Sequence, residues 1–118
     1  MIINEQFFED FDLNSIVTFL VLFRELNVSK TAVRLRVGQP AISNSLARLR
    51  LHFNDPLFLR AGRGVRPTPK AIEIAEALVP AIRDIETVLT LTLRPASLQI
   101  TDKNEIQEYS NGSQSTNE

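Results

Sequence analysis

The stretch that decides the fold is residues 29–53, SKTAVRLRVGQPAISNSLARLRLHF. Its first part predicts a short helix over residues 29–35, with the serine hydroxyl of Ser29 capping the amino terminus. The residues Arg-Val-Gly at 36–38 are expected to form a tight turn. A longer helix is expected over residues 39–53, because apolar residues recur there at helical spacing: Ile42, Leu46, Leu49 and Phe53. Two helices joined by a three-residue turn form the helix-turn-helix pattern, whose second helix enters a DNA major groove.

The outward side of the longer helix carries small uncharged polar residues where a helix that only packs would carry charges. Gln39, Ser43 and Asn44 can hydrogen-bond to base edges, and their short side chains let the helix approach the bases. Lys30 and Arg48 stand at helix flanks, where we expect them to contact phosphates. The alternative interpretation is an amphipathic helix whose polar side only faces water.

The segment before this motif, residues 12–26, is expected to be a further helix. Apolar residues recur at helical spacing along it, and Asp12 or Asn14 is a candidate N-cap. The apolar run at residues 16–23 would also fit a buried strand, but its length and its Leu and Phe content favour a helix. Its apolar stripe is wider than one face, which predicts contact with two partners.

A basic β-hairpin is expected directly after the helix-turn-helix. Residues 57–60 and 65–67 predict its strands, and the two glycines of the turn at 62–64 would supply positive φ angles. Arg63 lies between these glycines and is expected to reach into a minor groove, where narrow A·T-rich DNA concentrates negative potential. The hairpin arginines that we expect to face DNA are Arg60, Arg63 and Arg66. The predicted fold is therefore mainly α: a winged helix-turn-helix of three helices plus a two-stranded β wing.

A long linker helix is expected after the wing, from Thr68 as N-cap and Pro69 to about Leu93. Pro80 is expected to kink this helix or to shorten its regular part. It carries more apolar surface than a small winged helix can bury, which predicts helix-to-helix dimerisation. The expected interface residues are Ile72, Ala75, Val79, Ile82 and Leu89. The alternative is a helix that folds back on its own domain.

The charge of the chain is unevenly distributed. The net charge is −1, yet residues 26–72 carry nine lysines and arginines against one acid, Asp55. Both flanking segments are acidic, so the basic block indicates a surface for a polyanion. The chain has no cysteine, no apolar run long enough for a membrane and no basic leader at its start. We expect a cytoplasmic protein that does not contact membranes.

Catalysis is poorly supported. The single histidine, His52, ends the recognition helix and is not part of any cluster with metal-ligand spacing. The four glycines include no phosphate-binding loop. Glu73 and Glu76 are better explained as the solvated face of the linker helix. We expect no enzyme activity, no metal and no cofactor.

The sequence from Asp12 to Leu89 resembles the amino-terminal DNA-binding region of bacterial LysR-type transcriptional regulators. The resemblance includes Asp-Leu-Asn at the start of the first helix and FNDPLFLR before the wing. It implies a winged helix-turn-helix that dimerises through its linker helix, or assembles into tetramers, on an interrupted palindrome of double-stranded DNA. By position, it implies base reading by Gln39, Pro40, Ser43 and Asn44, a minor-groove contact by Arg63, and phosphate contacts by Ser29 and Lys30.

The chain departs from the family pattern at Gly38, where the family has a capping Ser or Thr, and at Thr31, where it has alanine. Four regions are expected: an arm at residues 1–11, the winged helix-turn-helix at 12–68, the linker helix at 69–93 and a polar, disordered tail at 94–118. No effector domain is present, so no small-molecule ligand is expected.

Two functions therefore remain open. The first is sequence-specific transcriptional regulation by the DNA-binding portion. The second is a short interaction module that forms mixed dimers with full-length relatives and blocks them.

Overall fold

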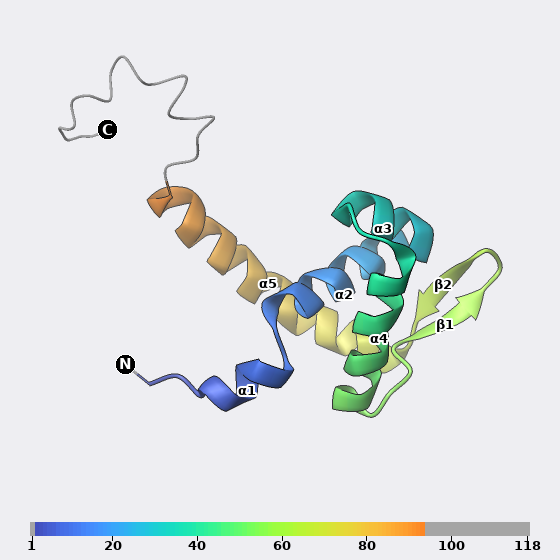
Figure 1. Ribbon diagram of the computed structural model, residues 1–118, viewed down its shortest axis with the longest axis horizontal. Helices are drawn as coiled ribbons and strands as arrows, with labels where there is room; N and C mark the ends of the chain where they lie inside the picture. The colour runs from blue at the N-terminus through green and yellow to red at the C-terminus, as the bar shows by residue number, and fades with distance from the viewer. Residues whose placement is uncertain (1, 94–118) are drawn as a thin grey trace, which may run out of the picture. The chain divides into compact units, whose positions relative to one another are not determined.

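The computed structural model describes residues 2–93 (Figure 1). Within them, the helices are α1 (Glu5–Asp10), α2 (Leu13–Glu25), α3 (Val28–Leu35), α4 (Gln39–Phe53) and α5 (Pro69–Thr92), and the strands are β1 (Phe58–Ala61) and β2 (Gly64–Pro67). Residues 1–80 form one compact unit, and the described remainder of α5 belongs to a second. The predicted mainly helical fold with a two-stranded wing is confirmed. The tail expected at residues 94–118 lies outside the described residues.

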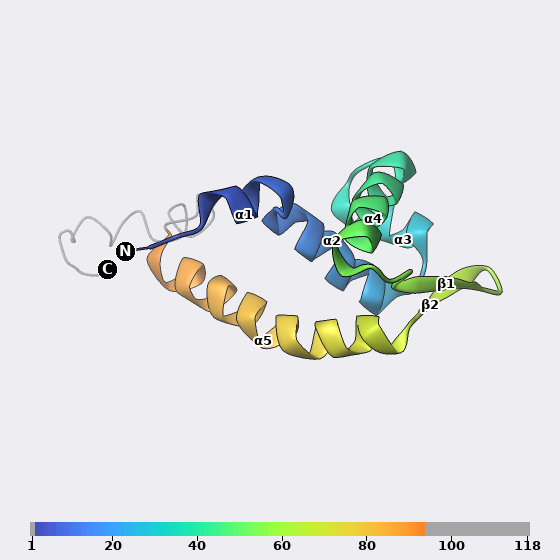
Figure 2. The same cartoon turned by 90° about the horizontal axis from the view of Figure 1, so that it is seen from below.

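The core of the first unit is built where α2, α4, the start of the hairpin and the first turns of α5 meet (Figures 1 and 2). The ring centroids of Phe19 and Phe58 lie 5.5 Å apart, which joins α2 to β1. Ala71 and Ala75 bring α5 against this core, because methyl side chains allow a helix to approach closely. The fully buried side chains of this cluster include Phe19, Leu22, Leu49, Leu57 and Phe58. Burial of this apolar surface holds the helix-turn-helix and the wing as one body.

Side-chain caps start the first helices of the motif. Asp12 accepts a hydrogen bond from the Ser15 backbone N–H at 2.8 Å, so of the two candidate caps it is Asp12 that begins α2. The prediction that Ser29 caps α3 is wrong, because Asn27 does so by accepting from the Lys30 N–H at 2.8 Å. Asparagine is a strong N-cap, and its position two residues earlier places Ser29 inside the first turn.

The departure at Thr31 is accommodated within the helix. Thr31 is fully buried, and its Oγ1 donates a hydrogen bond to the Asn27 carbonyl oxygen at 2.8 Å. The hydroxyl is therefore satisfied without leaving α3, and burying it does not leave an unpaired polar group. The crowding expected from a residue larger than alanine does not interrupt the helix.

A short helix, α1, occupies the region expected to be an arm. Asn4 caps it by accepting a hydrogen bond from the Phe7 N–H at 3.2 Å. The ring of Phe11 stacks on His52 at 5.0 Å and meets the edge of Phe53 at 5.5 Å, which ties the segment to the end of α4. Phe7 and Phe11 line an apolar hollow of about 430 Å³ within the first unit.

The hairpin projects beyond the helices in both ribbon views (Figures 1 and 2). Its strands are antiparallel, with Ala61 paired to Gly64, so the turn consists of Gly62 and Arg63. Only Gly62 has a positive φ, 58°, and the prediction that both glycines need one is wrong. Gly64 is required for another reason. A Cβ there would fall on the carbonyl oxygen of Leu26, closer than the 3.0 Å that real Cβ atoms keep.

Helix α5 begins as expected. Thr68 Oγ1 accepts a hydrogen bond from the Ala71 N–H at 3.1 Å, and Pro69 is the first helical residue. The helix is not ended by Pro80 and continues to Thr92. Ala75 was expected at a dimer interface, but it is 2% exposed and lies in the core of its own unit.

Candidate nucleic-acid interface

Helix α4 has one side in the core and one side in solvent. Ile42, Leu46 and Leu49 are buried. The candidate base-reading residues all lie on the exposed side of the helix: Gln39, Pro40, Ser43 and Asn44. Neither Ser43 nor Asn44 takes part in the packing of the fold. An uncharged hydrogen-bonding surface on a projecting helix is what a major groove requires.

The amino terminus of α4 is open. Gly38 occupies the N-cap position, and no side chain there hydrogen-bonds to the helix. The first N–H groups of α4 therefore lack the hydroxyl acceptor that a serine or threonine would supply. Such a terminus, with its partial positive charge, favours a phosphate.

The first turns of α3 and α4 meet through side chains. The Nε2 of Gln39 donates a hydrogen bond to the Oγ of Ser29, at 2.9 Å. Both residues are exposed, as is the neighbouring Lys30. The structure thus brings together a predicted base-reading residue and a predicted phosphate contact, a pairing that their separation in sequence does not reveal.

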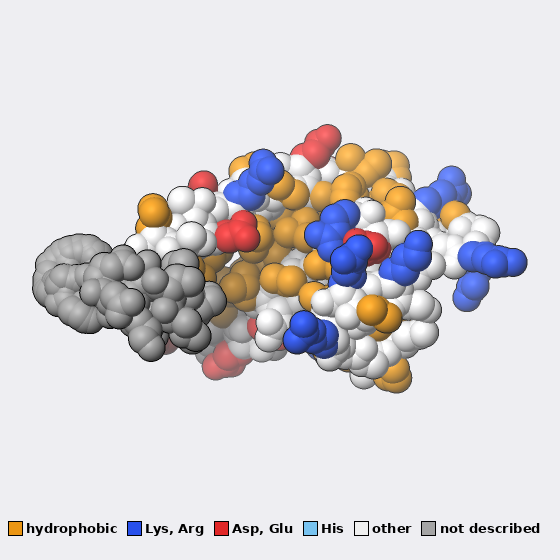
Figure 3. Space-filling model, turned by 90° about the horizontal axis from the view of Figure 1, so that it is seen from above, with side chains coloured by type: hydrophobic (Ala, Val, Ile, Leu, Met, Phe, Trp, Pro, Cys, Tyr) orange, Lys and Arg blue, Asp and Glu red, His pale blue; other side chains and the backbone are white. Residues whose placement is uncertain are grey.

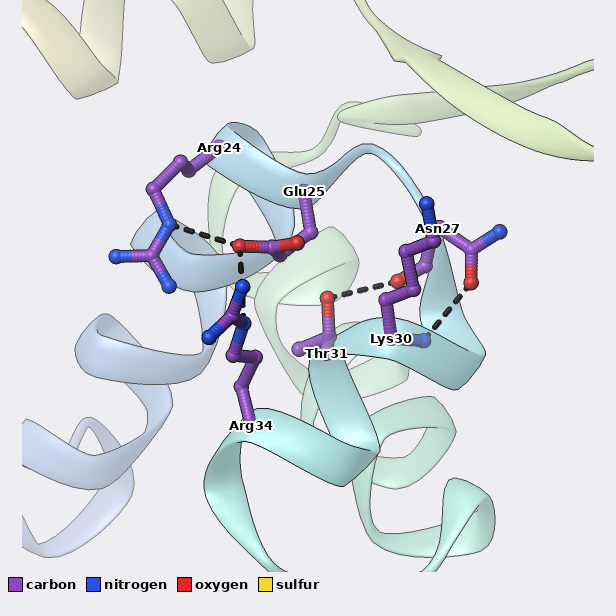
Figure 4. A network of polar contacts seen from close by, with 6 residues as sticks. All are labelled: Arg24, Glu25, Asn27, Lys30, Thr31 and Arg34. Carbon is purple, nitrogen blue, oxygen red and sulfur yellow. Dashed lines mark hydrogen bonds and ion pairs between the residues drawn. The ribbon is translucent and has the colours of Figure 1, made fainter.

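A polar network surrounds the turn between α2 and α3 (Figure 4). The Glu25 carboxylate, with only 14% of its side chain exposed, accepts from Arg24 Nε at 2.9 Å and forms an ion pair with Arg34 Nε at 3.5 Å. Arg34 belongs to the basic block, so part of the charge counted there is balanced by an acid outside it. The surface that remains for a polyanion is smaller than the sequence count indicates.

The base of the wing is held by two charged side chains that the site prediction did not include. Arg50 donates from Nε to the Pro56 carbonyl at 2.7 Å and from Nη2 to the Phe58 carbonyl at 3.1 Å. The Oδ2 of Asp55 accepts from the Leu57 N–H at 2.8 Å and from Thr68 Oγ1 at 2.7 Å. These bonds fix the end of α4, the start of β1 and the start of α5 relative to one another.

The sequence carried a signal for this junction. Asp55 stands in the FNDPLFLR motif and is the single acid of the basic block. Its oxygen accepts two hydrogen bonds, so its role is to hold the loop rather than to offset a charge. Arg50 likewise binds carbonyl oxygens of the protein, whereas Arg48, two residues earlier on α4, is exposed and makes no such contact among the bonds described.

The wing arginines are exposed but do not share one face. In the hairpin register Arg60 lies opposite Val65, and Arg66 lies opposite Leu59. Opposite residues in an antiparallel pair point to the same face and successive residues alternate, so Arg60 and Arg66 point to opposite faces. Arg63, in the turn, is the one wing arginine beyond both strands. Figure 3 shows basic side chains gathered over the helix-turn-helix and hairpin part of one face.

The remaining dimer candidates keep apolar surface. In the first unit Ile72 is 41% exposed and Val79 is 39% exposed. In the second unit Ile82 is half-buried and Leu89 is 46% exposed. These four residues stay a prediction for the interface, since only Ala75 is occupied by the core of its own unit.

The part of the chain that the structure describes contains no group of three or more His, Cys, Asp or Glu residues able to hold a metal ion. Within the same residues, no helix combines the length and the apolar character needed to cross a membrane.

The sequence matches the family model of the bacterial regulatory helix-turn-helix proteins, lysR family, over residues 13–72. It is 44% identical over 81 residues to the HTH-type transcriptional activator NagR of a Ralstonia species, and 44% identical over 80 residues to the HTH-type transcriptional activator NahR of Pseudomonas putida. These matches cover 69% and 68% of this chain. The chain spans about a quarter of each relative, 27% in both cases.

Solved structures show the same fold. A probable transcriptional regulator from Pseudomonas aeruginosa aligns with a TM-score of 0.65 at 37% identity, covering 69% of this chain and 27% of that one. The DNA-binding domain of BenM, in its complex with benA site 1 DNA, aligns with a TM-score of 0.63 at 21% identity, covering 69% of this chain and 94% of that one. The second likeness concerns the fold alone.

Proposed function

The chain belongs to the lysR family of bacterial regulatory helix-turn-helix proteins, and on that premise we propose that it binds double-stranded DNA sequence-specifically and regulates transcription in the bacterial cytoplasm. The observation that carries the proposal is the two-sided α4. Its apolar side builds the core, while Ser43 and Asn44 are exposed with hydrogen-bonding capacity unused by the fold. The relatives named above are transcriptional activators, which supports the same class of function.

The proposed contacts follow the geometry. Helix α4 lies in the major groove, where Gln39, Ser43 and Asn44 face base edges and Pro40 adds apolar contact. Arg48 and Lys30 bind phosphates on either side, and the open amino terminus of α4 favours another.

The wing contributes a second set of contacts. Arg63 enters the adjacent minor groove from the turn of the hairpin. Because Arg60 and Arg66 point to opposite faces, we expect only one of them to reach the DNA backbone in a given complex.

We propose that the protein acts as a homodimer on an interrupted palindrome, paired through α5. The supporting observation is exposed apolar surface on that helix at Ile72, Val79 and Leu89, which has no partner within the first unit. Two copies related by a two-fold axis would present two α4 helices to two half-sites, and pairing of dimers would give a tetramer. Sedimentation of Val79→Asp should show a weaker dimer.

The same apolar surface supports a second candidate, mixed dimers with full-length relatives that block their activity. Pairing through α5 requires a compatible helix but no DNA contact. The two candidates therefore differ in whether this chain itself recognises a DNA sequence.

Selection of bound DNA from a random pool, with the full chain, tests the proposal. Related half-sites should emerge, and affinity for them should fall steeply with salt because phosphate contacts release counterions. Asn44→Ala should relax preference at one base pair by about 1–3 kcal/mol, whereas Glu76→Ala, exposed on α5, should not. A pool without consensus, together with mixed dimers, would favour the second candidate.

A further inference from the structure

We infer that Ser29 is a positioning residue that orients the amide of Gln39 so that α4 selects adenine over guanine. The inference rests on the proposed function, because it concerns how the same surface reads DNA. It starts from the hydrogen bond of 2.9 Å in which Gln39 Nε2 donates to Ser29 Oγ. The two residues belong to different helices, so the bond joins the first turn of α3 to the first turn of α4.

The direction of this bond decides what Gln39 can still offer. A glutamine amide has two N–H donors and one carbonyl oxygen acceptor. With one N–H directed to Ser29, one donor and the acceptor Oε1 remain for a base. That remaining pair matches adenine, whose major-groove edge presents the N7 acceptor and the N6 amino donor.

Guanine does not match the same orientation. Its major-groove edge presents two acceptors, N7 and O6, so Oε1 of Gln39 would face O6 without a proton between them. Turning the amide over would offer donors to both guanine atoms but would break the bond from Nε2 to Ser29. Ser29 therefore penalises guanine without touching the base.

The bond also reduces the freedom of the side chain before DNA arrives. Glutamine is among the residues that lose most rotamer entropy when they are fixed, and both residues are exposed to solvent. A side chain already held by a partner loses less on binding, which favours the complex. The hydroxyl proton of Ser29 stays free to donate to a phosphate, so the contact expected from the family resemblance is compatible with this role.

Three variants of the full chain test the inference on the selected operator. Gln39→Ala first identifies the base pair at which discrimination is lost. At that pair the unaltered chain should bind adenine about 5- to 150-fold more tightly than guanine. Ser29→Ala should reduce this ratio by at least about fivefold while discrimination at the pair read by Asn44 stays the same, and Ser29→Thr, which keeps a hydroxyl, should restore it.

Lys30→Ala is the matched control, since Lys30 is the neighbouring exposed residue of α3 and carries no bond to Gln39 among those described. It should weaken binding to all sequences alike and lower the salt slope by about 1.

The inference is overturned if Ser29→Ala behaves like Lys30→Ala, or if the unaltered chain prefers guanine at this pair. Those outcomes leave sequence-specific binding intact, whereas failure to select any sequence would overturn the proposed function itself.

Discussion

Replacing Gly64 with alanine should lower the free energy of unfolding more than the same change at Gly62, although both glycines flank the same arginine. Gly62 has a φ of 58° and open space around its Cα, whereas Gly64 lies against the Leu26 carbonyl at the end of α2. That carbonyl also accepts a hydrogen bond from the Val65 N–H at 3.0 Å. A methyl group at Gly64 must therefore push the wing away from α2.

The cost follows from two terms. Forcing a backbone shift in a packed contact costs about 1–3 kcal/mol, and loss of the bond between Val65 and Leu26 adds about 1 kcal/mol. Alanine stabilises by up to about 1 kcal/mol through the unfolded chain, so Gly64→Ala should cost about 2–3 kcal/mol. Gly62→Ala carries only the left-handed penalty of about 1–2 kcal/mol, less the same compensation.

Urea denaturation followed by far-ultraviolet circular dichroism, at one protein concentration, measures both changes. Asparagine sharpens the comparison because it tolerates the left-handed region. Gly62→Asn should unfold close to the unaltered chain, and Gly64→Asn should unfold well below it. Equal midpoints for the two alanine variants, or a larger loss at Gly62, would show that φ and not the approach to Leu26 governs this hairpin.

Three other changes probe the junctions and the DNA surface. Gly38→Ser should raise the free energy of unfolding by about 0.5–1 kcal/mol, since a Cβ there meets only Pro40 Cδ at 3.4 Å; an unchanged urea midpoint would contradict the missing cap. Arg50→Ala should cost about 1–2 kcal/mol of stability by releasing two carbonyls, whereas Arg48→Ala should weaken DNA binding at unchanged stability, and equal urea midpoints would count against that division of roles. Arg63→Ala should weaken binding most at sites with A·T-rich flanks, measured by fluorescence anisotropy, while Arg83→Ala removes the same charge outside the wing; a loss independent of the flanks would contradict a minor-groove contact.

The features predicted correctly are those with a local cause. The bounds of α4 follow from a Pro in its first turn and apolar residues at helical spacing, and both signals lie inside the helix. The start of α5 follows from Thr68 next to Pro69 in the same way. The exposure of Ser43 and Asn44 follows from the opposite burial of Ile42 and Leu46, because a helix fixes the angle between them.

The features missed depend on segments that are distant in sequence. Neither Ser29 nor Gln39 indicates by itself that the two side chains meet. Ala75 fits an interface stripe as well as a core stripe, and only the approach of α5 to its own unit distinguishes them. Asn27 and Ser29 are both acceptable caps, so the choice between them rests on where the chain leaves the left-handed residue Leu26.

The sequence by itself determined the helix-turn-helix, the wing and the side of α4 that faces outward, because periodicity and capping act within a few residues along the chain. Tertiary structure alone decided that Gly64 yields room to α2, that Arg50 and Asp55 hold the base of the wing, and that Ser29 binds Gln39. Each of these depends on a distance between elements, which packing of the shared core sets and local propensity does not.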